Sequence, residues 1–412
     1  MPLGRRSVVA AVVFVLLCVV AGVGSWYETH RARPQAAAQR TVLLHVTNGG
    51  DTGSGTLREA LFVAATATGP TNVSIEVPTV TLKTALPPLV NGHGVTLFGQ
   101  PAGSEIDAAA LDQGPVLDVS GPDTAVDGIS IANCPGTAIL VRARHFHLSQ
   151  SSIQSCEVGV EVAENASDTL VDRNHFIGNR IGVRFGGSGR NSVVAGNEFT
   201  RNKDAALWAV RSTPDARDEV IGIHDNKFVE NGVVDGNIKV LMERNDFINA
   251  HEAAVHVVGE GAAIRGNRLN GGASMGIIVE NAGGALIEDN DLEGFAAYGV
   301  MVRGSSNAMV KANRLHNCGY GLAFVLGDAR NVSTAADNTI IEPKFNGIDV
   351  IGDSPVLRHN QVLRPHAFAL HVEDFQPPGG RKIHAQPFLD NNNFGGSPVS
   401  TNGIVAATKA AP

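Results

Sequence analysis

The chain has 412 residues, of which 43% are hydrophobic and 17% charged, so it can build a large core and is too apolar for a disordered protein. Its 40 acidic residues outnumber 32 basic ones and give a net charge of −8, which argues against a surface that binds nucleic acid. The 4 cysteines are too few for a disulfide scaffold and lack the spacing of a zinc site, so we expect no metal and no cofactor.

Residues 1–27 are predicted to be a membrane anchor or signal sequence. Arg5 and Arg6 precede the stretch 7–27, which contains no charged residue and, as a helix, is long enough to cross a bilayer core of about 30 Å. The arginines predict a cytoplasmic N-terminus and export of the rest. A cleaved signal peptide is the alternative. In both cases we expect a polar linker at 28–43 and then a periplasmic or extracellular domain of the cell envelope.

The initial part of the expected domain, residues 46–64, is VTNGGDTGSGTLREALFVA. Its segment GTLREAL at 55–61 is expected to form a short helix near 55–63, with Thr52 or Ser54 as its N-cap.

A pattern of the form apolar-x-x-Asn-x-apolar recurs along the chain. The asparagines of its successive copies are Asn174, Asn197, Asn226, Asn245, Asn267, Asn290, Asn313, Asn338 and Asn360. Short segments such as GVRF (182–185) and GIIV (276–279) follow the copies, and their alternation with period two is typical of half-buried strands. Each copy therefore predicts short strands separated by bends.

A unit of about 22 residues cannot bury its own apolar face, but a stack of such units can. In a stack, the repeated asparagine lines up at one bend, where its amide bonds to the next coil and its backbone tolerates left-handed φ. The LxxLxL signature of a leucine-rich horseshoe is missing. These repeats resemble the right-handed parallel β-helix of pectate-lyase-like proteins. The fold class we predict is all-β, a solenoid of about 11–13 coils over residues 44–375, followed by a fraying tail at 376–412.

The initial segment also resembles a known feature of extracellular parallel β-helix proteins. In that family a “GSLREAI”-like stretch forms a capping helix before the first coils, and GTLREAL at 55–61 matches it with Thr56 in place of Ser. The resemblance implies that the helix covers the N-terminal end of the solenoid. It concerns the fold and carries no chemistry.

The register of the repeats predicts two interior columns. Apolar residues that should stack inside the coil are Ile131, Ile153, Phe176, Phe199, Phe228 and Phe247. Three residues after the first two of these come Cys134 and Cys156, on neighbouring coils about 4.8 Å apart, a distance that a disulfide can span. Stacked buried thiols are the alternative. Cys318 occupies the same column several coils away and should be a free thiol.

Two outward columns beside the asparagines alternate in charge from coil to coil. They are His224, Glu243, Arg265, Glu288 and Lys311, and Lys227, Asp246, Arg268, Asp291 and Arg314. Alternation turns repulsion between like charges into attraction along the stack, so these columns predict a structural ladder and not a catalytic cluster.

A third outward column, in the second strand of each repeat, does not alternate. Over five consecutive coils it presents Glu161, Arg184, Trp208, Asp235 and His256. Trp208 could stack on a sugar ring, and Arg184 could pair with a carboxylate; with Glu161 they are the candidate substrate-binding residues. Asp235 and His256 could act as acid and base, with Arg184 as a cation near the reacting group. The alternative is a mixed polar wall with a partly covered tryptophan.

The long segment 211–219 follows Trp208 and is expected to wall one side of a groove there. His256 and Arg184 are three coils apart, about 14 Å, which is too far for one reacting pair. Asp235 has no close acidic neighbour in this column, whereas a hydrolase would use paired carboxylates. The sequence therefore leaves open whether the protein is an enzyme.

In the superfamily that these repeats resemble, substrates lie along the outer face, and lyases, hydrolases and epimerases all occur. The resemblance implies a protein that binds or modifies an acidic polysaccharide. The N-terminal stretch adds export, an envelope location and a membrane anchor, and the negative net charge predicts no nucleic-acid partner. A non-catalytic scaffold that binds a partner in the periplasm is the alternative.

Overall fold

The computed structural model describes residues 40–100, 103–187, 189–209, 220–236, 238–272, 274–327, 332–402 and 404–407. The expected anchor at 1–27, most of the linker and the segment 211–219 lie outside the described residues. Among the described residues, no helix has the length and apolarity needed to cross a membrane. The chain from Val42 onward forms one compact unit.

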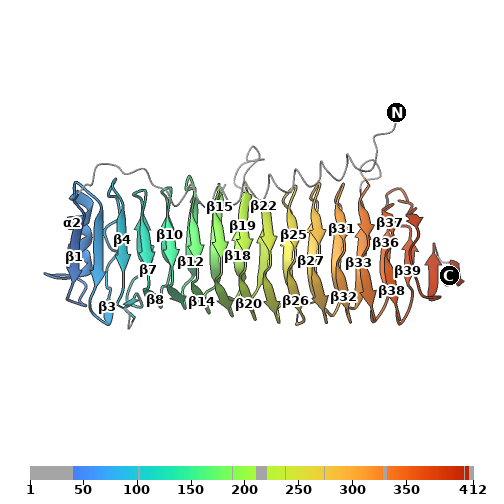
Figure 1. Cartoon of the computed structure of the whole chain (residues 1–412), viewed down its shortest axis with the longest axis horizontal. Helices are drawn as coiled ribbons and strands as arrows, with labels where there is room; N and C mark the ends of the chain where they lie inside the picture. Colours follow the sequence, from blue (N-terminus) through green and yellow to red (C-terminus); the bar gives the residue numbers. More distant parts are fainter. Residues whose placement is uncertain are drawn as a thin grey trace, which may run out of the picture. The chain divides into compact units, whose positions relative to one another are not determined.

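This unit is a parallel β-solenoid of about 12 turns, which confirms the predicted fold class. Each coil adds one strand to each of three sheets, and the strands of successive coils lie side by side along the stack (Figure 1). The described residues contain one helix, α2 (Leu57–Thr66). Short strands form because apolar and polar residues alternate over three to seven positions, so that one face of each strand enters the core.

The first sheet contains 15 strands among the described residues, all parallel, and we call it the 15-stranded sheet. Its strands are β1 (Val42–Val46), β2 (Thr71–Ile75), β4 (Val95–Phe98), β7 (Ala125–Asp127), β10 (His147–Ser149), β13 (Leu170–Asp172), β16 (Val193–Ala195), β19 (Val220–His224), β22 (Lys239–Glu243), β25 (Ala263–Arg265), β28 (Leu286–Glu288), β31 (Met309–Lys311), β34 (Thr334–Ala336), β37 (Val356–Arg358) and β40 (Phe388–Asp390).

The second sheet, the 13-stranded sheet, follows in each coil. Its strands, counted over the described residues, are β3 (Thr79–Thr81), β5 (Glu105–Asp107), β8 (Ser130–Ala132), β11 (Ser152–Gln154), β14 (His175–Ile177), β17 (Glu198–Thr200), β20 (Lys227–Val229), β23 (Asp246–Ile248), β26 (Arg268–Asn270), β29 (Asp291–Glu293), β32 (Arg314–His316), β35 (Thr339–Ile341) and β38 (Gln361–Leu363).

The third sheet, the 14-stranded sheet in the described part of the chain, carries the candidate site. Its strands are β6 (Leu117–Val119), β9 (Thr137–Val141), β12 (Val158–Glu164), β15 (Ile181–Gly187), β18 (Ala205–Ala209), β21 (Val233–Gly236), β24 (Ala253–Val257), β27 (Met275–Glu280), β30 (Tyr298–Arg303), β33 (Tyr320–Val325), β36 (Ile348–Ile351), β39 (Leu370–Glu373), β41 (Pro398–Thr401) and β42 (Ile404–Ala407).

The core runs continuously between the three sheets, and the predicted aromatic column lies inside it. Phe176, Phe199, Phe228 and Phe247 are buried and stack ring on ring, with centroids 4.8, 5.0 and 4.6 Å apart. Because each ring meets the ring of the next coil, the column holds neighbouring coils in register.

The predicted asparagine ladder lies at the corner between the 15-stranded and 13-stranded sheets. The side-chain amide of Asn245 donates to Ile223 O and to Asn267 Oδ1, each at 2.9 Å. Its Oδ1 accepts from the backbone and side-chain nitrogens of Asn226. The prediction for the backbone was wrong in one respect: the residue before the asparagine, for example Arg244 with φ 52°, is left-handed, and the asparagine is not. The preceding residue makes the bend, which leaves the asparagine side chain pointing inward.

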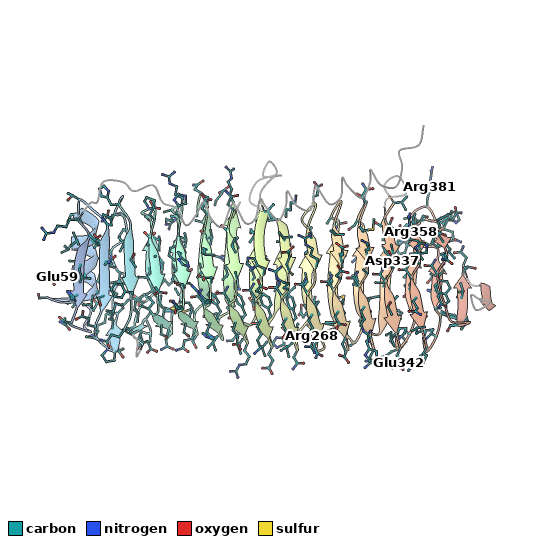
Figure 2. All side chains as sticks on the ribbon, viewed as in Figure 1. Glu59, Arg268, Asp337, Glu342, Arg358 and Arg381 are labelled. Carbon is teal, nitrogen blue, oxygen red and sulfur yellow. A yellow bond between two sulfur atoms is a disulfide. The ribbon has the colours of Figure 1, made fainter. Side chains whose placement is uncertain are left out.

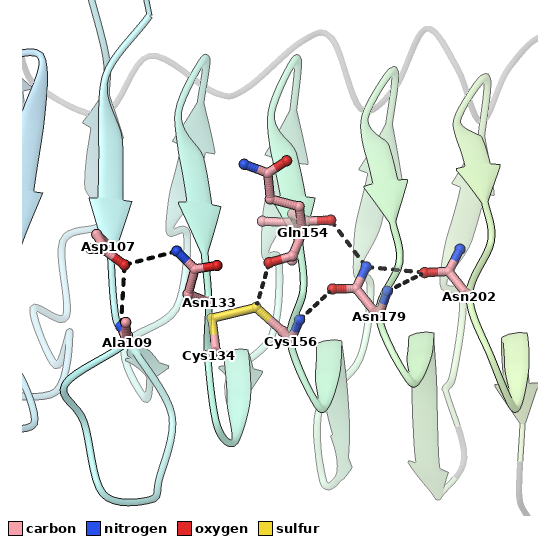
Figure 3. Close-up of a disulfide and its surroundings, with 9 residues drawn as sticks. Asp107, Ala109, Asn133, Cys134, Gln154, Cys156, Asn179 and Asn202 are labelled. Atoms are coloured by element: carbon pink, nitrogen blue, oxygen red, sulfur yellow. Dashed lines mark hydrogen bonds between the residues drawn. A yellow bond between two sulfur atoms is a disulfide. The ribbon is translucent and has the colours of Figure 1, made fainter.

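A second ladder lies at the corner between the 13-stranded and 14-stranded sheets (Figure 3). Asn179 donates to Asn202 Oδ1 at 3.0 Å and accepts a hydrogen bond from the backbone nitrogen of Cys156, also at 3.0 Å. Cys156 and Cys134 continue this column and are joined by a disulfide, with their Cα atoms 4.3 Å apart. Cys318 is a buried free thiol, as expected, and burial raises its pKa to about 11.

The alternating charge columns also lie in register. Glu243 on β22 pairs with Arg265 on the next coil, and Lys311 lies 3.0 Å from Glu288. Arg268, labelled in Figure 2, pairs in register with Asp246 on one side and Asp291 on the other. The ion pairs support the structural interpretation of the first column, and the strand register places opposite charges beside one another in the second.

The expected helix near 55–63 is α2, and Leu57 and Leu61 are among the residues that it buries against the first coils. Its N-cap is Thr56, and not Thr52 or Ser54 as the sequence suggested, because the Thr56 hydroxyl accepts from Glu59 N. The arginine of the GTLREAL segment, Arg58, forms an ion pair with Asp51 at 2.7 Å.

The coils extend past the range 44–375 on both sides. The first strand, β1, begins at Val42, and β40 and β41 continue the 15-stranded and 14-stranded sheets within the segment expected to fray. The last strand, β42, turns back and pairs antiparallel with β41.

Candidate functional site

The third column of the sequence analysis forms one row on the outer face of the 14-stranded sheet. Strand pairing places Glu161 beside Arg184, Arg184 beside Trp208, Trp208 beside Asp235, and Asp235 beside His256. The register shifts between Ala205 and Leu207, and the row stays aligned past that irregularity. We call Glu161, Arg184, Trp208, Asp235 and His256 the outer row.

Trp208 is half-buried and lies on a small apolar patch. Val158, Ile181 and Ala205, all buried, together with the partly buried Val233, form this patch. It is separate from the solenoid core, so its apolar side chains lie on the outer side of the sheet. The patch supports one side of the indole and holds it at the surface.

His256 lies between two carboxylates. Its Nδ1 is 3.3 Å from Asp235 Oδ1, and its Nε2 is 3.4 Å from Glu280 Oε2. The hydrogen bond to Asp235 is the largest cause that raises the pKa of His256 above 6.5, and Glu280 adds to it against the opposing effect of burial. A raised pKa favours the imidazolium, so His256 is better suited to donate a proton than a histidine with an unperturbed pKa.

Sequence reasoning missed Glu280. It belongs to β27, two residues after Ile278, the residue that pairs with His256 in the row. Residues two apart in a strand point to the same face, so the period-two alternation already placed Glu280 beside the row. Its other partner is Arg303, at 3.4 Å. Asp235 therefore has an acidic neighbour across His256, which the single column did not show.

Arg184 is paired with Glu161, whose Oε1 lies 2.7 Å from its guanidinium nitrogen Nη2. Thr137 donates a further hydrogen bond to Glu161 at 3.2 Å. The structure thus separates the five candidate residues into an ion pair on one side of Trp208 and an Asp–His pair on the other. Arg184 does not approach the Asp–His pair, as expected from its distance of three coils from His256 along the row.

A shallow depression of about 280 Å³ lies elsewhere, at the corner of the first asparagine ladder. Arg173, Glu198, Asp225 and Lys227 are among the residues that line it. Its charged groups are engaged with one another or with neighbours: Lys227 lies 3.4 Å from Glu198, and Asp225 lies 2.9 Å from Arg244. We therefore assign it a structural role. Across the described residues, no cluster of three or more His, Cys, Asp or Glu side chains is arranged to hold a metal ion.

Stacked coils whose short strands form three parallel sheets place the protein in the class of parallel β-helix repeat proteins. The family described as “Right handed beta helix region” matches residues 90–218 and 216–362. Because these matches cover more than half of the chain, the protein belongs to the right-handed β-helix family.

Two solved structures show the same fold at low sequence identity. The catalytic unit of a GH87 α-1,3-glucanase from Streptomyces thermodiastaticus has a TM-score of 0.60 and 14% identity, over 91% of this chain and 73% of that one. A tailspike protein mutant of E. coli bacteriophage HK620, in complex with a pentasaccharide, has a TM-score of 0.55 and 11% identity, over 85% and 78%. No curated protein matches the chain in sequence.

Proposed function

We propose that this protein binds a polysaccharide along the outer face of the 14-stranded sheet, between Glu161 and Glu280. The observation that carries the proposal is the position of Trp208, half-buried on an outer apolar patch and beside the Asp235–His256 pair. Both neighbouring structures described above are proteins that act on or bind glycans, which supports this class of ligand.

The arrangement suits the two kinds of surface that a sugar presents. The C–H face of a sugar ring can stack on the indole of Trp208, which its apolar patch keeps at the surface. Sugar hydroxyls can donate to the carboxylates of Asp235 and Glu280 and accept from the His256 imidazolium. Together, these groups provide an apolar platform with donors and acceptors on one side of it.

The sequence-based expectation of an acidic glycan requires a cationic side chain that is free to bind the carboxylate of the sugar. Arg184 is already paired with Glu161, and His256 lies between two carboxylates. A uronate would have to break these pairs and would approach negative groups, which costs electrostatic energy. We therefore propose recognition mainly through ring faces and hydroxyls, and keep an acidic polymer as the comparison ligand.

Glycoside hydrolysis is the second candidate function, favoured by the two carboxylates on either side of His256. A hydrolase uses one group to protonate the leaving oxygen and a carboxylate to activate water or attack the sugar. The raised pKa of His256 suits proton donation and does not suit the proton abstraction that a lyase or C5-epimerase performs. If binding occurs without turnover, the protein is the non-catalytic scaffold considered above.

We also propose that the domain works outside the cytoplasm, in the cell envelope, tethered by the apolar stretch 7–27. The Cys134–Cys156 disulfide supports an oxidising compartment, because such bonds are rare in the cytosol. The test is the location and alkylation state of the protein in fractionated cells of its source: a cytosolic, fully reduced protein would contradict this part of the proposal.

The central experiment replaces Trp208. We expect Trp208→Ala to weaken binding of an α-1,3-glucan oligosaccharide at least tenfold, about 1.4 kcal/mol, with the melting temperature little changed. Phe388→Ala is the matched control, because Phe388 is an exposed aromatic side chain on β40, outside the 14-stranded sheet, and its loss should leave this binding unchanged. An oligogalacturonate titration compares the acidic class. Wild-type affinity in Trp208→Ala would contradict the proposal.

Turnover is measured on the same proteins through newly formed reducing ends. If the protein hydrolyses the glucan, Asp235→Asn and Glu280→Gln should each abolish product formation and retain binding. If wild-type protein binds the glucan and releases no product, the hydrolytic candidate is rejected.

A further inference from the structure

The strand position of the outer row continues on later coils, and near the C-terminal end of the solenoid it holds a second Asp–His pair. Strand pairing places Asp349 on β36 beside His371 on β39, in the same relation as Asp235 and His256. On the coils between the two pairs, the same strand position is occupied by the apolar residues Ile278, Met301 and Ala323. Five coils separate Asp235 from Asp349, about 24 Å at the spacing of adjacent strands.

An aromatic row lies beside this second pair, where each strand begins. Tyr298 and Tyr320 stack with ring centroids 4.9 Å apart, and Phe345 continues the stack at 5.0 Å. Both tyrosines are half-buried, and Phe345 is 49% exposed. The two tyrosines lie three residues before the row positions Met301 and Ala323, on neighbouring coils of the same sheet.

Asp349 is only 3% exposed. Asn346 donates to its Oδ1 at 2.7 Å, and His371 Nδ1 lies 3.2 Å from the same oxygen. That nitrogen is buried, so its contact with Asp349 is shielded from solvent. Burial raises the pKa of Asp349, and burial followed by the charge of Asp349 raises the pKa of the Tyr298 hydroxyl. The carboxyl group, the imidazole and the Tyr298 ring therefore belong to one cluster.

We propose that this cluster, formed by Tyr298, Tyr320, Phe345, Asp349 and His371, is a second carbohydrate-binding site for a neutral glycan. The edges of the stacked rings give an apolar ridge, and tyrosine hydroxyls give donors and acceptors along it. The His371 side chain, which is 24% exposed, can bond sugar hydroxyls beside the ridge, and the buried Asp349 holds that ring in place. The class of ligand rests on the proposed function; the position of the site does not.

The charges around the cluster favour a neutral ligand over a uronate. Glu373, exposed on the strand that carries His371, adds negative charge near Asp349 and contributes to the rise of its pKa. An anionic sugar would meet two carboxyl groups here. Because both sites lie on one sheet face, two segments of the same polysaccharide can occupy them together, which raises the overall affinity for a long chain.

The test is the number of sites measured by calorimetric titration of the full chain with an α-1,3-glucan tetrasaccharide. We expect two sites in the wild type and one in Asp349→Asn, a substitution that keeps the shape of the side chain. Tyr320→Ala is the second variant and should weaken the same site at least tenfold. Asp337→Asn is the control, because Asp337 belongs to the same coils but lies outside the 14-stranded sheet. Melting curves establish that each variant is folded.

Tryptophan fluorescence separates the two proposals. Trp208 is beside the first site, and the other tryptophan, Trp26, lies in the N-terminal segment. The fluorescence response should persist in Asp349→Asn, and the second site should persist in Trp208→Ala. A single site that only Trp208→Ala removes overturns the second site and leaves the proposed function intact. A single site that only Asp349→Asn removes overturns the proposed function at Trp208 and leaves the second site intact. Absence of binding in the wild type overturns both.

Discussion

The corner that carries the asparagine ladder and the outer face of the 14-stranded sheet belong to the same coils, yet their side chains differ in kind. At the corner, one residue type recurs from Asn174 to Asn360, and each side chain bonds to the next. On the outer face, the residue changes on nearly every coil, from Glu161 through Trp208 to His256.

The difference lies in the bonding capacity that each region leaves for a ligand. An asparagine of the ladder uses both amide protons and its oxygen within the stack, so nothing remains to bind another molecule. The outer face holds an indole on an apolar patch and, near its C-terminal end, the half-buried rings of Tyr298 and Tyr320. In a solenoid, departures from the repeat are therefore where a ligand-binding surface should be sought.

The largest expected effect is at the ladder. Asn245→Ala removes the acceptor of two Asn226 nitrogens and the donor to Ile223 O and Asn267 Oδ1, all buried. With each unsatisfied group costing about 1–3 kcal/mol, we expect a loss of about 4 kcal/mol in the free energy of unfolding. Urea denaturation measures it, and Asn270→Ala, an exposed asparagine on β26, is the control. If Asn245→Ala unfolds at the same urea concentration as the wild type, the asparagine ladder does not stabilise the fold.

The disulfide should rank next. Replacing Cys134 and Cys156 with serine should cost about 3 kcal/mol, because the bond closes a loop between residues 22 apart and continues the second ladder. Cys318 is the internal control: its buried thiol, with its pKa raised to about 11, should resist alkylation until the protein unfolds. Equal stability of the double variant and the wild type would mean that this end of the second ladder does not need the covalent bond.

On the outer face, the expected effect is on titration. Asp235→Asn removes the main cause of the raised pKa of His256, so its pKa should fall, as followed by NMR of the imidazole protons. With the pKa raised, the stability that His256 contributes is complete below 6.5 and is lost as the pH rises through its pKa in the folded protein. The variant should show a weaker loss over that range. An unchanged pKa of His256 in this variant would show that Asp235 does not influence its titration.

The smallest effect should come from the charge columns. Glu243→Lys replaces the partner of Arg265 with a like charge and should cost about 1 kcal/mol or less, since the Arg265 side chain is 42% exposed. The cost should shrink at high salt, and glycan binding should not change. Loss of glycan binding with unchanged stability would show that the ligand binds at this corner and not on the outer face of the 14-stranded sheet.

Repetition explains how much of the fold the sequence could predict. Nine asparagines in series define the register, and that register placed Trp208 beside Asp235 across the longest gap between copies. The aromatic column and the proximity of Cys134 to Cys156 followed from the same count. A column, however, lists one residue for each coil, so partners two positions away along a strand were overlooked.

The overlooked parts of the site show this limit. Glu280 lies next to His256 through a shift of two residues, and Tyr298 and Tyr320 lie three residues before the row. The tyrosines each precede a glycine at the start of a strand, a signal that the sequence contained. The Arg184–Glu161 pair could not be distinguished from two free charges, because side-chain torsions decide whether neighbours on adjacent coils meet.

The two ends of the solenoid decide whether the stack stops at one molecule. Parallel coils end in exposed strand edges, which invite another chain to continue the sheets and so build a fibre. At the first end, α2 lies against β1 and β2, and at the other, β42 reverses direction against β41. A reversed strand breaks the parallel pattern that a following coil would need. The repeating middle of the chain is thus closed at both ends by segments that do not repeat.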